Sequence, residues 1–210
     1  MKTCIPLPGF SLALVLLAGT VVRADQPLPT GLRFVTGPVN GAVLERDGRC
    51  LCVYGDPSNQ QLTPDWVLLT HARRDAVWPA RELAKRGVKV VAPEAETDSL
   101  TRPERFWAEM REKRFHDYAQ QSTKVPVPPV AVSRAVKPGE TIEWSGLSIR
   151  VIDTPGYTRG AVSYLVSLGG QTVAFSGDLI DDPDFGLDEG WAGLHPYWQT
   201  MRPGESAKLL

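Results

Sequence analysis

Residues 65–76 read DWVLLTHARRDA, so that a short apolar run leads directly into a loop of polar and charged residues. A continuously apolar run of this length is typical of a strand that is buried on both faces of a sheet. Residues 77–86 have the pattern of a helix with Pro79 in its first turn, and residues 88–92 read as a second buried strand. The stretch therefore predicts a strand–helix–strand unit in which His71 lies in the loop after the first strand.

The rest of the chain alternates short strands with turn residues. Asp47-Gly48 separates two apolar runs and predicts a hairpin. Strands are expected at residues 32–36, 39–45, 50–54, 130–136, 141–144, 147–153, 161–168 and 171–175, and residues 102–121 have the spacing of an amphipathic surface helix. The alternation of hairpins with a strand–helix–strand unit predicts the α/β fold class, as a sandwich of two sheets with helices outside.

Two further motifs follow predicted strands. Residues 153–158 read DTPGYT, and residues 175–179 read FSGDL. Together with the THARRDA of residues 70–76, they resemble the metallo-β-lactamase-fold hydrolase superfamily, whose motifs are T-H-x-H-x-D-H, T-P-G-H-T and S-G-D. The resemblance covers about residues 31–210 and implies a metallo-β-lactamase-like αββα sandwich. The family's last strand and the loop with its last metal histidine find no counterpart, so we expect the second half of the sandwich to be incomplete.

In that family the motifs hold one or two metal ions, usually zinc, which activate water to attack an ester, thioester or amide bond. The resemblance implies that His71, Asp75 and Asp178 are the remaining metal ligands, because each matches a ligand position of its motif. Two protein ligands for each ion are fewer than the roughly three that a catalytic zinc requires. We therefore expect zinc to bind weakly, and no other cofactor is expected.

Three positions where the family has histidine hold other residues, namely Arg73, Ala76 and Tyr157. We expect these residues, with Thr158, to line the site. A guanidinium is a fixed positive charge that opposes a metal ion beside it but can pair with a carboxylate. Arg73 is therefore interpreted as a surrogate for the metal that pairs with one of the remaining aspartates, and Tyr157 as a neutral filler of a vacated ligand position.

These substitutions favour a protein that is hydrolase-like by descent and catalytically impaired. One alternative is a weak single-metal hydrolase of an ester, thioester or amide bond that uses His71, Asp75 and Asp178, with a further ligand such as His195. A second alternative is a non-enzymatic binding or structural module with residues 102–121 as its contact surface. The sequence names no small-molecule substrate or ligand, because specificity in this superfamily lies in loops.

Residues 1–24 have the pattern of a signal peptide, with Lys2 before an apolar stretch at residues 10–22 and a cleavage site after Ala24. The apolar stretch is shorter than the roughly 20 residues that span a bilayer. We expect an exported protein, periplasmic or secreted, with no stable membrane span after cleavage and one C-terminally incomplete domain at residues 25–210. The formal net charge of −1 gives no indication of nucleic acid as a partner.

Overall fold

The computed structural model describes residues 12–13, 27–36, 40–56, 61–105, 108, 128–155 and 157–179; at residues 12, 13, 74 and 75 it describes the backbone alone. The predicted features that lie outside the described residues are most of the signal peptide, most of the helix at residues 102–121, and His195. No helix within the described residues combines the length and the apolar character that crossing a bilayer requires.

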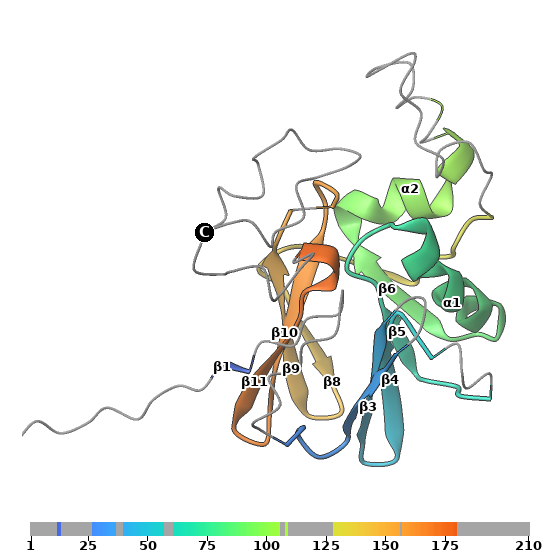
Figure 1. Ribbon diagram of the computed structural model, residues 1–210. Coiled ribbons are helices and arrows are strands. Elements are labelled where there is room, and N and C mark those ends of the chain that lie inside the picture. The colour runs from blue at the N-terminus through green and yellow to red at the C-terminus, as the bar shows by residue number, and fades with distance from the viewer. Residues whose placement is uncertain are drawn as a thin grey trace, which may run out of the picture.

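The first sheet has six strands in the order β2-β3-β4-β5-β6-β7 (Figure 1). They are β2 (Leu32–Val35), β3 (Gly41–Arg46), β4 (Arg49–Val53), β5 (Trp66–Leu68), β6 (Lys89–Pro93) and β7 (Arg134–Val136). Strands β2, β3 and β4 pair antiparallel, whereas β4, β5, β6 and β7 pair parallel. Asp47 and Gly48 both have positive φ, 52° and 73°, as a two-residue hairpin turn requires. The predicted hairpin is confirmed.

The predicted strand–helix–strand unit is present as β5, helix α1 (Arg74–Lys85) and β6, with β5 and β6 as parallel neighbours. The predicted start of the helix was wrong, because α1 begins at Arg74 and has Pro79 in its interior. The first turn closes early, since the N–H of Val77 donates to the carbonyl of Arg73 at 3.0 Å. Pro79 has no backbone N–H, so one hydrogen bond of this helix is absent, but the helix continues past the proline.

A 3₁₀ turn, η1 (Glu94–Glu96), and a short helix, α2 (Thr97–Thr101), follow β6. The sequence pattern did not predict either element. Figure 1 shows α1 and α2 beside the first sheet. Within the described residues no α-helix follows the strands β8 to β11 of the second sheet.

The second sheet has the strand order β1-β11-β10-β9-β8. Its strands are β1 (Leu12–Ala13), β8 (Thr141–Trp144), β9 (Leu147–Asp153), β10 (Val162–Leu168) and β11 (Gln171–Phe175), and a 3₁₀ turn, η2 (Gly177–Leu179), follows β11. Strands β8 to β11 form an antiparallel meander. Strand β1 belongs to the predicted signal peptide and pairs parallel with β11.

Two hydrogen bonds connect the sheets at the end where the sequence motifs lie. The buried hydroxyl of Tyr164 donates to the carbonyl of Leu69 at 2.8 Å, and the N–H of Val162 donates to the carbonyl of Thr70 at 2.9 Å. Both acceptors immediately follow β5, so the loop after β5 is fixed to β10 of the other sheet. The predicted sandwich of two sheets is confirmed.

Gly177 provides a test of this close approach between the sheets. A Cβ at Gly177 would lie 2.2 Å from Oγ1 of Thr70 and 2.8 Å from the hydroxyl of Tyr54, and the residue has φ +60°. We expect Gly177→Ala to lower the free energy of unfolding by about 2–4 kcal/mol, since steric overlap adds to backbone strain. Urea denaturation measures this change.

Gly170→Ala is the matched control. Gly170 also has positive φ, +81°, but a Cβ there would meet no heavy atom of the described residues within 4 Å. This substitution should therefore cost only the backbone strain, about 1–2 kcal/mol. Equal losses from the two substitutions would contradict the close packing of η2 against Thr70 and Tyr54.

Candidate active site

The ends of three strands meet at one end of the sandwich, and each carries one of the sequence motifs. His71 lies between β5 and α1 in residues 69–73, here called the His71 loop. Tyr157 lies between β9 and β10 in residues 154–161, the Tyr157 loop, and Asp178 lies in η2 after β11. Nε2 of His71 is 3.4 Å from Oδ2 of Asp178, and the ring centroids of His71 and Tyr157 are 5.1 Å apart.

The imidazole of His71 is buried and held from one side by two hydroxyl groups. Its Nδ1 lies 2.9 Å from Oγ1 of Thr70 and 3.2 Å from the hydroxyl of Tyr54, and these two hydroxyls also hydrogen-bond with each other. Burial raises the pKa of Tyr54 well above its usual value, so its hydroxyl keeps its proton. Nε2 makes no hydrogen bond within the described residues, although it faces Asp178.

Sequence analysis did not identify Tyr54 as a site residue, because it was counted only as the last residue of a predicted strand. In the structure it directly follows β4 with φ 64°, which is unusual for a residue other than glycine. The available signal was its position at the end of a buried strand next to the strand that leads to His71.

The guanidinium of Arg73 lies against the carboxylate of Asp178. Its Nη1 is 2.5 Å from Oδ2, and the side chains are 41% and 10% exposed, respectively. The same guanidinium lies over the ring of Tyr157, 5.5 Å from the centroid. The contact expected between Arg73 and one of the aspartates is therefore present with Asp178. The backbone of Asp75 is in the first turn of α1, and its side chain is outside the described atoms.

Asp178 is nearly buried, and its environment holds it in the ionised form. Burial alone would raise the pKa of this carboxyl. His71 and Arg73 outweigh that effect, and together they lower the pKa of Asp178 well below its usual value. The site is thus organised around a carboxylate that is charged throughout the ordinary pH range.

A second buried carboxylate, Glu96, lies on the other side of the His71 loop. Its Oε2 accepts the N–H of Ala72 at 3.0 Å, and burial raises its pKa above the usual value. Sequence analysis missed Glu96 because it belongs to η1, a turn that the pattern did not predict. An acidic residue a few positions after a buried strand was the only signal.

The other predicted lining residues are also placed near these loops. Ala76 is buried in the first turn of α1, and Thr158 is buried in the Tyr157 loop. Tyr157 itself is half-buried. Neither the methyl group of Ala76 nor the ring of Tyr157 offers an imidazole nitrogen to a metal ion.

The described residues do not fit a metal ion held in the manner that the sequence motifs imply. Within them, no three side chains of His, Cys, Asp or Glu form a group that could hold a metal. A catalytic zinc needs about three protein ligands. Of the predicted ligands, His71 and Asp178 converge, and the cation that contacts this pair is Arg73.

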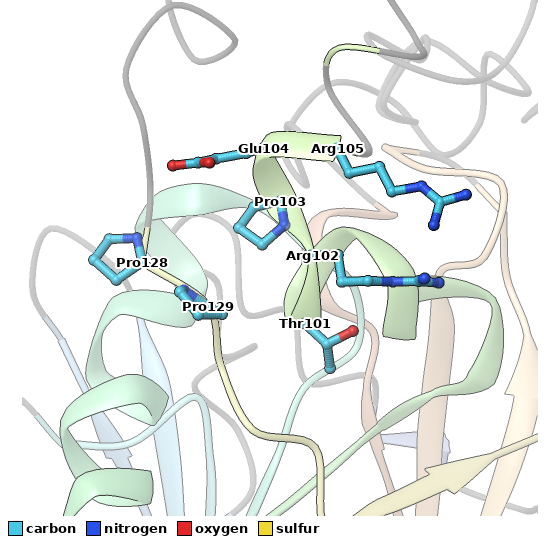
Figure 2. A pocket seen from close by; sticks show the side chains of 7 residues that line it. All are labelled: Thr101, Arg102, Pro103, Glu104, Arg105, Pro128 and Pro129. Atoms are coloured by element: carbon cyan, nitrogen blue, oxygen red, sulfur yellow. The ribbon is translucent and has the colours of Figure 1, made fainter.

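A separate pocket of about 510 Å³ lies away from these residues (Figure 2). It is lined by Thr101, Arg102, Pro103, Glu104, Arg105, Pro128 and Pro129. Figure 2 shows Glu104 on one side of this pocket and Arg105 on the other. None of the motif residues lines it, so it is not part of the candidate site.

Comparison with known sequences supplies a family and distant relatives. The model of the metallo-β-lactamase superfamily matches residues 36–204. A hydroxyacylglutathione hydrolase of Acidiphilium cryptum is 31% identical over 117 residues, which are 55% of this chain and 35% of that protein. Glyoxylase B2 of Dictyostelium discoideum is 28% identical over 166 residues, 78% of this chain and 52% of that protein. The chain thus spans about a third to a half of the length of these curated relatives.

Solved structures show the same fold. A metallo-β-lactamase of Cronobacter sakazakii, described by an HARLDQ motif, has a TM-score of 0.53 at 21% identity and covers 75% of this chain and 62% of that one. The native FEZ-1 metallo-β-lactamase of Legionella gormanii has a TM-score of 0.56 at 15% identity, covering 88% of this chain and 75% of that one. At these identities the likeness establishes the fold alone.

The depressed pKa of Asp178 predicts how stability depends on pH. Because this pKa is lower in the folded than in the unfolded protein, the stabilisation is complete above the unfolded value of about 4 and is lost as the pH falls below it. Between pH 5 and pH 3, the wild-type protein should lose about 1–2 kcal/mol more than Asp178→Asn. Urea denaturation across this range measures both proteins. Parallel stability curves would show that Asp178 contributes no pH dependence.

Proposed function

Because the chain belongs to the metallo-β-lactamase superfamily, we propose that it is a hydrolase-like member in which metal-dependent hydrolysis is impaired. The observation that carries this proposal is the contact between Arg73 and Asp178, with Nη1 at 2.5 Å from Oδ2. A guanidinium cannot lose its charge in a protein, so it competes permanently with a metal ion for this carboxylate. Arg73 acts as the surrogate for the metal.

The other changed positions support the same proposal. Ala76 offers no ligand atom, and the ring of Tyr157 packs over the guanidinium of Arg73.

Residues 71–76 read HARRDA, which shares the first three letters and the aspartate with the HARLDQ motif that describes the Cronobacter sakazakii protein. An arginine at the third letter therefore also occurs in another protein of this fold.

Zinc content tests the proposal directly. The purified protein, equilibrated with excess zinc and then desalted, should contain well under one zinc per chain by elemental analysis. Arg73→His/Ala76→His/Tyr157→His should raise the zinc content, because it removes the competing charge and adds three imidazoles. The matched control is the same triple variant with Asp178→Asn, which should lose most of that gain.

Activity is measured in parallel with a hydroxyacylglutathione thioester, the substrate class named by the Acidiphilium cryptum relative. The wild-type protein should hydrolyse it no faster than buffer does. About one zinc per wild-type chain, together with hydrolysis that a chelator abolishes, would overturn the proposed impairment.

A second candidate function is a weak single-metal hydrolase that uses His71, Asp75 and Asp178. One observation favours it: Nε2 of the buried His71 makes no hydrogen bond within the described residues, and it faces Asp178 at 3.4 Å. An imidazole nitrogen and a carboxylate oxygen are both ligand atoms that zinc accepts in proteins. Substoichiometric zinc with slow, chelator-sensitive hydrolysis would select this function over the first.

We also propose that the protein is exported, by the signal peptide expected at residues 1–24, and that residues 25–210 act on or bind a small molecule rather than nucleic acid. The sequence pattern and the formal net charge of −1 support this proposal. Mass spectrometry of the protein from culture fractions checks it: a mature N-terminus after Ala24 in the periplasm or medium is expected. An uncleaved chain in the cytoplasm would contradict it.

The surrogate role of Arg73 also predicts its contribution to stability. Removing a partner from a fully buried ion pair costs about 3–5 kcal/mol, but the side chain of Arg73 is 41% exposed and solvent screens the pair. We therefore expect Arg73→Ala to lower the free energy of unfolding by about 1–2 kcal/mol. A double-mutant cycle with Asp178→Asn isolates the interaction. A coupling energy near zero would contradict the surrogate role.

A further inference from the structure

The carboxylate of Glu96 contacts the two loops that form the candidate site. Its Oε2 accepts the N–H of Ala72, within the His71 loop, at 3.0 Å. Its carboxylate also faces the backbone of Gly160, within the Tyr157 loop, and this backbone favours the ionised form of the carboxyl. Glu96 is only 5% exposed, so these loop groups take the place of water around it.

Gly160 shows how closely the Tyr157 loop approaches this carboxylate. A Cβ at Gly160 would lie 2.4 Å from Oε1 of Glu96 and 2.6 Å from Cβ of Ala95. Both distances are shorter than van der Waals contact, so a side chain at this position would push the loop away from η1. A residue without a Cβ is therefore needed for the contact between the Tyr157 loop and Glu96.

We propose that Glu96 is a positioning residue of the candidate site, whose buried carboxylate fixes the His71 loop against the Tyr157 loop. It acts through the backbone of Ala72 and of Gly160, one in each loop. This role is independent of the proposed function, because it concerns the relative placement of the two loops and not what they bind.

The chemistry of a carboxylate suits this position. An ionised carboxylate only accepts hydrogen bonds, and here backbone N–H donors of two loops face it. Glutamine has the same shape, but its amide NH₂ is a hydrogen-bond donor. It cannot accept a hydrogen bond from the backbone N–H group that faces it. Glu96→Gln therefore removes one of the two contacts while preserving the packing volume.

Amide hydrogen exchange on the full chain, measured by NMR, tests the proposal. In Glu96→Gln the amide of Ala72 or of Gly160 should exchange at least about tenfold faster than in the wild type, because a hydrogen bond to a charged group is lost. The amide of Val151, in the core strand β9, should keep its protection, since the protein remains folded. The ring signals of His71 should shift; His71→Asn assigns them among the three histidines of the chain.

Glu94→Gln is the matched control. Glu94 begins the same turn as Glu96 but is exposed and pairs with Lys137 at 3.2 Å. Its substitution should leave the exchange of Ala72 and Gly160 and the signals of His71 as they are in the wild type. The proposal is overturned if Glu96→Gln behaves like Glu94→Gln. It is also overturned if Val151 exchanges faster by the same factor as Ala72, because Glu96 would then only support global stability.

A measurement on the wild-type protein keeps the proposal testable if Glu96→Gln does not fold. The amides of Ala72 and Gly160 lie in loops, and they should nevertheless be protected from exchange, because the first donates to a buried carboxylate and the second faces it. Exchange of either amide at the rate of an unprotected loop residue would overturn the proposed role.

Discussion

A nearly buried carboxylate must have a cationic or hydrogen-bonding partner, and in this protein that constraint falls on Asp178. The side chain of Asp178 comes from the end of β11, and it meets groups from the end of β5 that the sandwich brings to the same place. His71 faces it at 3.4 Å and Arg73 at 2.5 Å. The ring of Tyr157 then packs over the guanidinium. The arrangement of the site therefore follows from the need to neutralise the charge of the Asp178 carboxylate.

Contacts outside the predicted metal-ligand positions help the loops around Asp178 to keep their shape. Hydroxyls of Tyr54 and Thr70 hold the imidazole from the side opposite Asp178. Glu96 holds the backbone of the next residue in the loop. A scaffold built in this way can lose imidazoles from its ligand positions without losing the loop conformations, because the anchors lie elsewhere in the chain. On the proposed function, that separation accounts for a retained fold with a changed ligand set.

The sequence predicted the parts of the structure that depend on local pattern. The β5–α1–β6 unit, the Asp47-Gly48 hairpin and the meeting of the three motifs all follow from periodicity, turn chemistry or motif order. Tyr54 and Glu96 escaped prediction because their partners in the His71 loop are 17 and 24 residues away in the chain, and only the folded sheet brings them together. The early start of α1 was not predicted, because Pro79 was expected in the first turn, whereas the helix tolerates it in its interior after the first turn has closed.

The order in which ligands could be regained follows from the same electrostatics. A divalent ion beside Asp178 would lie close to the guanidinium of Arg73, and charges of +2 and +1 about 4 Å apart repel by about 8 kcal/mol at a protein surface. A new imidazole at Ala76 or Tyr157 would have to overcome that repulsion before it contributed any affinity. Replacing Arg73 first removes the repulsion and leaves Asp178 and His71 free to accept a cation. On the proposed function, Arg73 is therefore the first residue to replace.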